Sequence, residues 1–231
     1  MPDTLLGVQT LFHGPRLQIT EIKVSDTLRV CRHFSYFYIM NFPEPGLYHI
    51  YNRGNNKEPI FFGDGDYIHF ISLCKKHIAN RCEILAWCLM PNHFHFMVDV
   101  NDASLDPVKW GGNIMPSISN GFQLLQSNYS KRINYRENRT GSLFQQKTKS
   151  KLLETESYAL TAFWYLHQNP VKAALAKNML EWEYSSYKEY CGRNECLSKV
   201  ELGKTILNLS EIDFRSDSLV TLREEELEKI F

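Results

Sequence analysis

Apolar and polar positions alternate near the centre of the chain in a way that predicts strands. HFHFMVDV at residues 93–100 alternates with a period of two, and CEILAWCLM at residues 82–90 is typical of a buried strand. A Pro-Asn pair separates the two runs, so they are predicted to form a β-hairpin. Shorter strands are predicted at residues 47–51, before the turn sequence NRGNN, and within the loosely alternating residues 142–153. Residues 101–114 are predicted to be a loop.

Apolar residues at helical spacing predict three helices. The first covers about residues 64–78, with Asp64 or Asp66 as its cap. The second covers residues 117–136 and is ended by the sequence NRTG, in which glycine is the expected stop. The third begins at Glu154 or Thr155 and is closed by the Asn-Pro pair at residues 169–170.

The order strand, helix, hairpin, helix, strand predicts an α+β fold: a ferredoxin-like antiparallel sheet with helices on one face. This domain is expected to span residues 40–190. Residues 1–39 lack a sustained period and are interpreted as an N-terminal extension that the domain does not need for folding. Residues 191–231 are interpreted as an acidic C-terminal appendage, because residues 198–231 carry eight carboxylates against five basic side chains.

Composition narrows the class of protein. The chain has 231 residues, of which 43% are hydrophobic, as expected for one sizeable globular core. It holds 26 basic and 26 acidic residues, so its net charge indicates no partner. No apolar run reaches the roughly 18 residues of a membrane helix, and no secretory signal is apparent. The six cysteines form no C-x-x-C pair, which favours reduced core thiols in a cytoplasmic protein.

His93 and His95 are the sharpest chemical signal. Residues two apart in a strand point to the same face, so both imidazoles project together and can chelate a divalent metal. The alternative is a pair of half-buried sheet histidines with no ligand. His49 can lie on a neighbouring strand and is interpreted as structural.

Tyr129 is the second candidate, as a nucleophile in the middle of a predicted helix. A free tyrosine has a pKa of about 10 and reacts poorly at neutral pH, but nearby cations or a metal would favour its phenolate. Tyr135 is the rival in the same segment. The alternative for Tyr129 is a core position, because it lies on the apolar stripe of its helix.

Basic residues are concentrated between residues 129 and 152. This span holds seven lysines or arginines and one carboxylate, Glu137, a net charge of +6 in an otherwise neutral chain. Such a concentration favours phosphate binding, and aromatic rings at Tyr129, Tyr135 and Phe144 could stack on unpaired bases. The alternative is a solvated helix face and loop.

Five pieces of the sequence, in order, resemble the single-tyrosine HUH transposases, specifically the REP-associated tyrosine transposase branch. HUH denotes two histidines around one hydrophobic residue, here His93-Phe94-His95. The other pieces are YHIYNRGNNKEPIFF at 48–62, YSKRIN at 129–134 with RTGSLFQ at 139–145, YLHQNPVKAAL at 165–175, and WEYSSYKEY at 182–190. The resemblance covers about residues 46–190.

This resemblance implies a metal-dependent DNA transposase, a single-strand endonuclease and strand transferase that acts through a covalent 5′-phosphotyrosine. His93 and His95 would hold Mg²⁺ or Mn²⁺, and Tyr129 would attack the scissile phosphate. A third metal ligand is expected from the tyrosine helix, for which Asn134 is the candidate. Five residues along a helix is roughly 140° of rotation, so Tyr129 and Asn134 share a face only if the helix is distorted.

The resemblance also implies the partner, single-stranded DNA with hairpin or palindromic repeats, bound by a monomer or a homodimer. Lys147 stands where the family often has arginine, which keeps the charge and loses bidentate phosphate geometry. The alternatives are a nucleic-acid-binding protein that has the same fold without cleavage, and a metal-dependent hydrolase. The residues expected to contact DNA are Arg53, Asn55, Asn56, Lys131, Arg132, Arg136, Arg139, Lys147 and Lys149.

Overall fold

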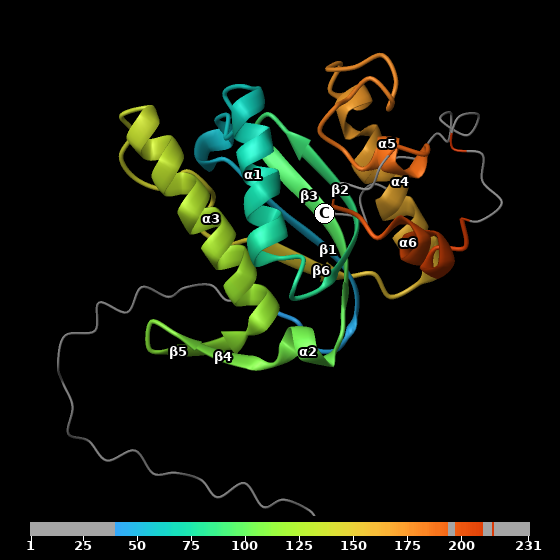
Figure 1. The fold of residues 1–231 in the computed structure, drawn as a ribbon, viewed down its shortest axis with the longest axis horizontal. Helices are drawn as coiled ribbons and strands as arrows, with labels where there is room; N and C mark the ends of the chain where they lie inside the picture. Colours follow the sequence, from blue (N-terminus) through green and yellow to red (C-terminus); the bar gives the residue numbers. More distant parts are fainter. Residues whose placement is uncertain (1–39, 194–196, 210–213, 215–231) are drawn as a thin grey trace, which may run out of the picture. The chain divides into compact units, whose positions relative to one another are not determined.

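The computed structural model describes residues 40–193, 197–209 and 214 (Figure 1). The N-terminal extension predicted at residues 1–39 lies outside the described residues.

A four-stranded antiparallel sheet forms the centre of the described fold, with strand order β2-β3-β1-β6. One helix, α1, connects β1 to β2, and another, α3, connects β3 to β6, so the topology is the predicted ferredoxin-like one. The strands are β1 (Gly46–Arg53), β2 (Glu83–Met90), β3 (His93–Val100) and β6 (Lys149–Leu152).

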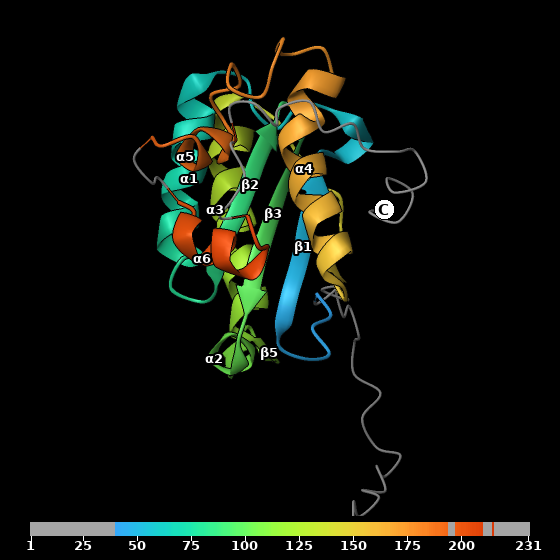
Figure 2. The same cartoon turned by 90° about the vertical axis from the view of Figure 1, so that its right-hand side faces the viewer.

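Two long helices, α1 (Asp64–His77) and α3 (Ser117–Arg136), cover one face of the sheet (Figures 1 and 2). The alternation along β3 turns Phe94 and Phe96 toward these helices, where both side chains are fully buried. Phe122 of α3 packs against both rings, with centroids 6.5 Å and 5.8 Å away. This face therefore carries the larger aromatic core of the protein.

The opposite face of the sheet is covered as well, by α4 (Glu156–Lys172), α5 (Tyr187–Tyr190) and α6 (Val200–Ile206) (Figure 2). A second core lies between these helices and the sheet. Its buried residues include members of α4, β2 and the segment after residue 196. The described part of the predicted C-terminal appendage thus packs onto the sheet.

Helix α4 is anchored to the sheet through buried polar groups. His167 Nε2 lies 2.8 Å from the hydroxyl of Ser186, and both residues are fully buried. The same hydroxyl accepts a hydrogen bond of 2.9 Å from the backbone N–H of Trp87 on β2. A buried polar group without a partner is costly, so these bonds fix the position of α4 against the strand.

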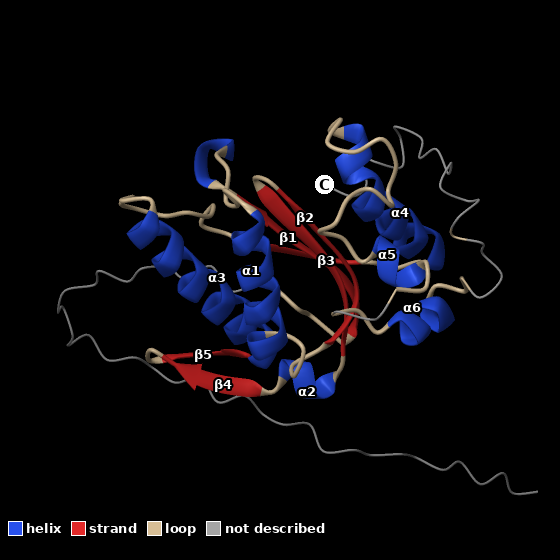
Figure 3. Ribbon diagram, turned by 45° about the horizontal axis from the view of Figure 1, so that its top comes forward, coloured by secondary structure: helices blue, strands red, loops and turns tan. Residues whose placement is uncertain are grey.

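The region predicted as a loop at residues 101–114 contains regular structure. A short helix, α2 (Asp102–Leu105), starts from a capping box between Asn101 and Ser104. A β-ribbon follows, formed by β4 (Pro107–Trp110) and β5 (Asn113–Pro116) (Figure 3). Both glycines at the turn of the ribbon, Gly111 and Gly112, have positive φ. Adjacent glycines are typical of a tight hairpin turn as well as of a loop, so the sequence alone predicted a loop.

Two predicted boundaries also differ from the structure. Helix α4 continues through Pro170 to Lys172, because a proline in the last turn disturbs few of the remaining helical hydrogen bonds. The loosely alternating residues 142–153 yield only the short strand β6 at their C-terminal end. A 3-10 turn, η1 (Asn55–Lys57), occupies part of the predicted turn after β1.

Among the described residues, no helix combines the length and apolar character that a membrane crossing requires. The four described cysteines, Cys74, Cys82, Cys88 and Cys191, are free thiols, as predicted, and the first three are buried.

We expect Gly121→Ala to destabilise the fold, because a Cβ there would lie 2.5 Å from the carbonyl oxygen of His77 and 2.8 Å from Cδ of Arg81. Overpacking of this kind costs about 1–3 kcal/mol. Gly65→Ala is the matched control, since nothing lies within 4 Å of a Cβ at that position. The control should leave the free energy of unfolding unchanged or raise it by up to about 1 kcal/mol. Urea unfolding measures the free energy of unfolding of both variants. Equal values for Gly121→Ala and Gly65→Ala would contradict the close approach of α1 and α3.

Candidate functional site

His93 and His95 project from β3 toward α4, on the face of the sheet opposite the aromatic core. Their ring centroids are 4.9 Å apart and the rings are nearly perpendicular. In the pairing with β1, His93 lies opposite Arg53 and His95 lies opposite Tyr51. Four side chains of two neighbouring strands therefore meet on one face, as the period of two predicts.

Each histidine uses its Nδ1 in a hydrogen bond within the protein. His93 Nδ1 lies 2.6 Å from Oδ1 of Asn92, whose Nδ2 donates to the carbonyl of Lys57. His95 Nδ1 lies 2.9 Å from Nε2 of His49. The Nε2 of His95 is buried and has no hydrogen-bond partner. Because His95 also lines the pocket described below, this unpartnered nitrogen is available to a metal ion.

The surroundings keep both rings neutral. Burial lowers the pKa of His93 to about 4, and the positive charge of Arg53 acts in the same direction. Burial also holds the pKa of His95 well below its usual value, with further contributions from its charged and imidazole neighbours. Neutral imidazole is the form that binds metal, so the rings are in the required state at neutral pH.

A pocket of about 340 Å³ opens in front of the two histidines. Its walls come from β1, β3, the segment before and within β6, and helix α4. It is lined by Tyr51, Asn52, Arg53, His93, His95, Gln145, Lys147, Lys149, Tyr165 and Asn169.

Helix α4 contributes Tyr165 and Asn169 to this pocket. The two residues are four apart, so they lie on the same face of the helix. The ring centroid of Tyr165 is 5.7 Å from that of His95, and both α4 side chains are nine-tenths buried. Burial raises the pKa of Tyr165 to about 12, against the opposing effect of the Asn169 side chain. The phenol is therefore protonated at neutral pH.

The donor atoms of the pocket fit a divalent cation. Two imidazoles and the amide oxygen of Asn169 can be offered from the protein, and phosphate or water oxygens can complete the shell. Within the described part of the chain, no group of three or more histidines, cysteines, aspartates or glutamates is placed to hold a metal ion. This donor set is compatible with Mg²⁺ or Mn²⁺.

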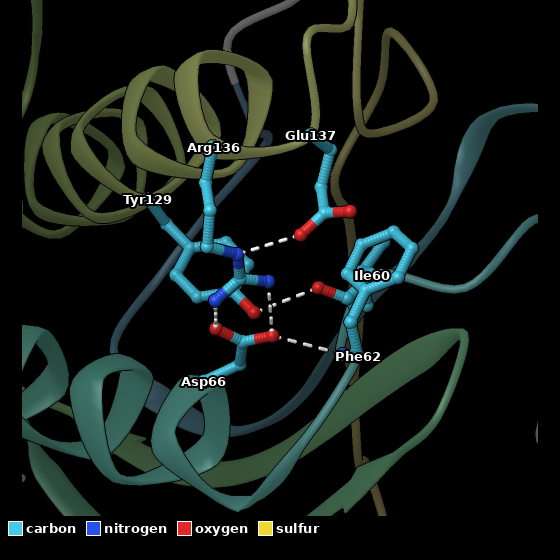
Figure 4. Close-up of polar contacts among 6 residues, drawn as sticks. All are labelled: Ile60, Phe62, Asp66, Tyr129, Arg136 and Glu137. Carbon is cyan, nitrogen blue, oxygen red and sulfur yellow. Dashed lines mark hydrogen bonds and ion pairs between the residues drawn. The ribbon is translucent and has the colours of Figure 1, made fainter.

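Tyr129, predicted as the nucleophile, lies on the other face of the sheet, in the aromatic core. Its side chain is fully buried, and its hydroxyl donates a hydrogen bond of 2.7 Å to the carbonyl of Ile60 (Figure 4). Aromatic rings of Phe61 and Phe70 surround it, and burial raises the pKa of its phenol. The sheet separates Tyr129 from the histidines, so within one chain it is a core residue of helix α3.

Asn134, predicted as the third metal ligand, also lies on α3, away from the pocket. Its Nδ2 donates to the carbonyl of Gly141 at 2.9 Å. Tyr129 and Asn134 therefore do not come together beside the two histidines. Asn169, unlike Asn134, lines the pocket beside His93 and His95.

The predicted basic footprint is divided by the sheet. Arg136 forms a two-pronged ion pair with Asp66 and a further pair with Glu137 (Figure 4). Arg139 pairs with Glu58 at 3.0 Å. These two arginines therefore form ion pairs within the protein, on the α3 side of the sheet.

The remaining residues predicted to contact DNA fall into two groups. Arg53, Lys147 and Lys149 line the histidine pocket, and the Nε of Arg53 is buried without a partner. The ammonium of Lys149 lies 5.4 Å from the ring centroid of Tyr51. The others lie outside the lining: Asn55 and Asn56 in η1, and Lys131 and Arg132, both exposed, on α3.

Tyr165 and Asn169 are the site residues that the sequence analysis missed. A usable signal was present in YLHQNP, where a tyrosine and an asparagine stand at the i, i+4 spacing of one helix face. The apolar residues Phe163, Trp164 and Leu166 of the same helix favoured the interpretation of the segment as a buried helix only. His49 was identified as structural, and it contacts His95 directly.

No protein-family model and no curated protein matches this sequence. Among solved structures, the chain is similar to a REP-associated tyrosine transposase bound to a REP hairpin, with a TM-score of 0.49 and 14% sequence identity. The match covers 68% of this chain and 87% of that chain.

We expect Tyr129→Phe to lower the free energy of unfolding by about 1–2 kcal/mol, because the buried carbonyl of Ile60 loses its donor. Tyr135→Phe is the matched control on the same helix, since Tyr135 is 89% exposed. The control should leave stability unchanged. Thermal or urea unfolding measures both; a Tyr129→Phe variant as stable as wild type would contradict the structural role.

Proposed function

We propose that this protein is a metal-dependent DNA strand transferase that cuts single-stranded DNA through a covalent bond to Tyr165. The observation that carries the proposal is that Tyr165 and Asn169 share one pocket with His93 and His95. A phenol, two imidazoles and an amide around one cavity suit phosphoryl transfer to tyrosine. The resemblance of the sequence to single-tyrosine HUH transposases supports the same reaction class, with a different tyrosine from the one first expected.

In the proposed step, the phenolic oxygen of Tyr165 attacks the phosphorus of a phosphodiester. The new O–P bond forms as the bond from phosphorus to the 3′ oxygen breaks. The phenolic proton leaves to solvent, and the departing 3′ oxygen takes up a proton to become a hydroxyl. The product is a 5′-phosphotyrosine and a free 3′ end. Because the phosphodiester becomes a phosphotyrosine diester, another 3′-hydroxyl can reverse the step and join strands without a nucleotide cofactor.

His93, His95 and Asn169 would hold the metal ion. When bound there, Mg²⁺ or Mn²⁺ would supply Lewis-acid stabilisation of charge on the phosphate oxygens. The chain's own cations would bind the substrate directly, since Arg53, from β1, can donate to a phosphate beside the histidines. Its unpartnered buried Nε is consistent with such a ligand.

Lys147 and Lys149 would hold the strand on either side of the cleaved phosphate. They lie at the pocket on the β6 side, and Tyr51 offers an aromatic face next to Lys149. The pocket lies between the sheet and α4, which favours an unpaired strand over a duplex. We therefore propose single-stranded DNA as the substrate, with a hairpin or palindromic repeat beside the cleaved position.

The adduct assay tests this proposal. Fluorescently labelled single-stranded oligonucleotides carrying the hairpin repeats that flank the gene are incubated with Mn²⁺ and each protein, then separated on a denaturing gel. Wild type and Tyr129→Phe should both give a covalent band of reduced mobility. Tyr165→Phe should give none, because phenylalanine lacks the attacking oxygen while keeping the ring.

Each other outcome of the adduct assay has a defined meaning. A band lost in Tyr129→Phe and retained in Tyr165→Phe would overturn the assignment and restore the α3 tyrosine, acting from a second copy. A band retained in both variants would point to Tyr51, which also lines the pocket. Tight binding of the same DNA by wild type without any adduct would identify a binding protein that does not cut.

Binding of the strand provides a second prediction. We expect Lys149→Gln to weaken binding of these oligonucleotides and to reduce the slope of log affinity against log salt by about 0.7, the contribution of one phosphate contact on a single strand. Lys131→Gln removes a lysine that is also exposed, from α3 on the other face of the sheet, and should change neither quantity. Fluorescence anisotropy over a salt series measures the affinity and the salt slope of each variant. If Lys131→Gln changed them as much as Lys149→Gln, the strand would have to contact α3 as well.

A further inference from the structure

We infer that His49 is a positioning residue that holds the proton of His95 on Nδ1 and thereby leaves Nε2 of His95 free for the metal. The inference rests on the proposed function, in which His95 is a metal ligand. It assigns a role in the site to a residue outside the pocket lining.

The geometry of the two rings defines a direct hydrogen bond. Nε2 of His49 lies 2.9 Å from Nδ1 of His95, while the ring centroids are 5.1 Å apart and the planes differ by 17°. Such values place the bond nearly in the planes of both rings, which is the direction of an imidazole N–H or lone pair. Both residues are almost completely buried, at 1% and 2% exposure, so water does not compete for the bond.

Proton counting gives this bond two possible directions. A neutral imidazole carries one N–H and one lone pair. If His49 donates, His95 must carry its own proton on Nε2, and that nitrogen cannot bind a metal. If His95 donates from Nδ1, its Nε2 presents a lone pair to the pocket. Only the second direction is compatible with a metal at His95, and it requires His49 to accept.

His93, the other proposed metal ligand, also has its proton on Nδ1, and there the partner allows only one direction of the hydrogen bond. Nδ1 of His93 faces Oδ1 of Asn92, an oxygen that can only accept, so His93 carries its proton on Nδ1. Asn92 is oriented by its own donation to the carbonyl of Lys57. His49 would thus do for His95 what Asn92 does for His93. Partners of this kind fix the ring orientation and the proton position of metal-binding histidines.

His49 is itself held in place and does not replace a ligand. Its ring stacks on Tyr51, with centroids 4.8 Å apart and planes within 23°. It does not line the pocket, and the nitrogen nearest the site is already engaged by His95. On β1 it lies opposite Met97, two residues along the strand from the pair formed by Tyr51 and His95.

Metal affinity tests this role. Isothermal titration with Mn²⁺ compares wild type, His95→Ala, His49→Phe and His49→Gln. We expect His49→Phe to bind Mn²⁺ about 10–100-fold more weakly, because the acceptor for Nδ1 of His95 is lost. His49→Gln should bind close to wild type, since its side-chain oxygen can accept at the same place. Equal affinities of wild type and His49→Phe would overturn the inference.

The proton position gives a readout that a purely structural role would not move. Long-range ¹H–¹⁵N correlation spectra of wild type with Mg²⁺ should show His95 protonated on Nδ1 and not on Nε2. In His49→Phe the Nε2-protonated form should increase. A wild-type His95 protonated on Nε2 in the presence of Mg²⁺ would overturn the inference, even if His49→Phe failed to fold.

His95→Ala separates this inference from the proposed function. If His95→Ala binds Mn²⁺ as tightly as wild type, the metal site itself is elsewhere and the proposed function fails. If His95→Ala loses Mn²⁺ while His49→Phe keeps it, the metal site stands and only the role of His49 is wrong.

Discussion

The period of two along β3 is the constraint on which the described structure depends. Successive side chains of an antiparallel strand point to opposite faces, so Phe94 and Phe96 enter the aromatic core while His93 and His95 line the pocket on the other face. Helices cover both faces, and the strand is shielded from bulk solvent over most of its length. The same alternation that stabilises the aromatic core therefore also presents two imidazoles side by side. A shift of one residue in register would send the histidines into the aromatic core and the phenylalanines into the pocket.

This division by the sheet explains how much of the protein could be predicted from its sequence. The strands, the hairpin, the long helices and the shared face of the two histidines follow from local periodicity, and these predictions are confirmed by the topology. The face of the sheet that each helix covers depends on tertiary packing, and local periodicity in the sequence does not determine it. Tyr129 is on an apolar stripe beside many cations, whereas Tyr165 stands within the apolar run AFWYL, which has no such concentration of charge. Only the packing shows that the second one faces the histidines.

The basic residues illustrate the same limit for electrostatics. A run of cations in the sequence gives one local net charge, but the fold distributes them over two faces. Arg136 and Arg139 satisfy carboxylates within the protein, whereas Lys147 and Lys149 lie at the pocket. Ion pairs of this kind reduce the field that a partner would meet on the α3 side. The charge that matters for a phosphate is therefore the charge left after internal pairing, which depends on contacts distant in sequence.

Helix α4 has residues that line the pocket on one side and a residue that anchors it to the sheet on another. Tyr165 and Asn169 face the pocket, while His167, between them in the sequence, is bound through Ser186 to strand β2. The phenol and the amide are consequently parts of one rigid body, and their separation is set by the helical repeat. If α4 moved, both groups would leave the histidines together, so this half of the site is either fully assembled or fully absent. The buried bond at His167 holds that unit in its assembled position.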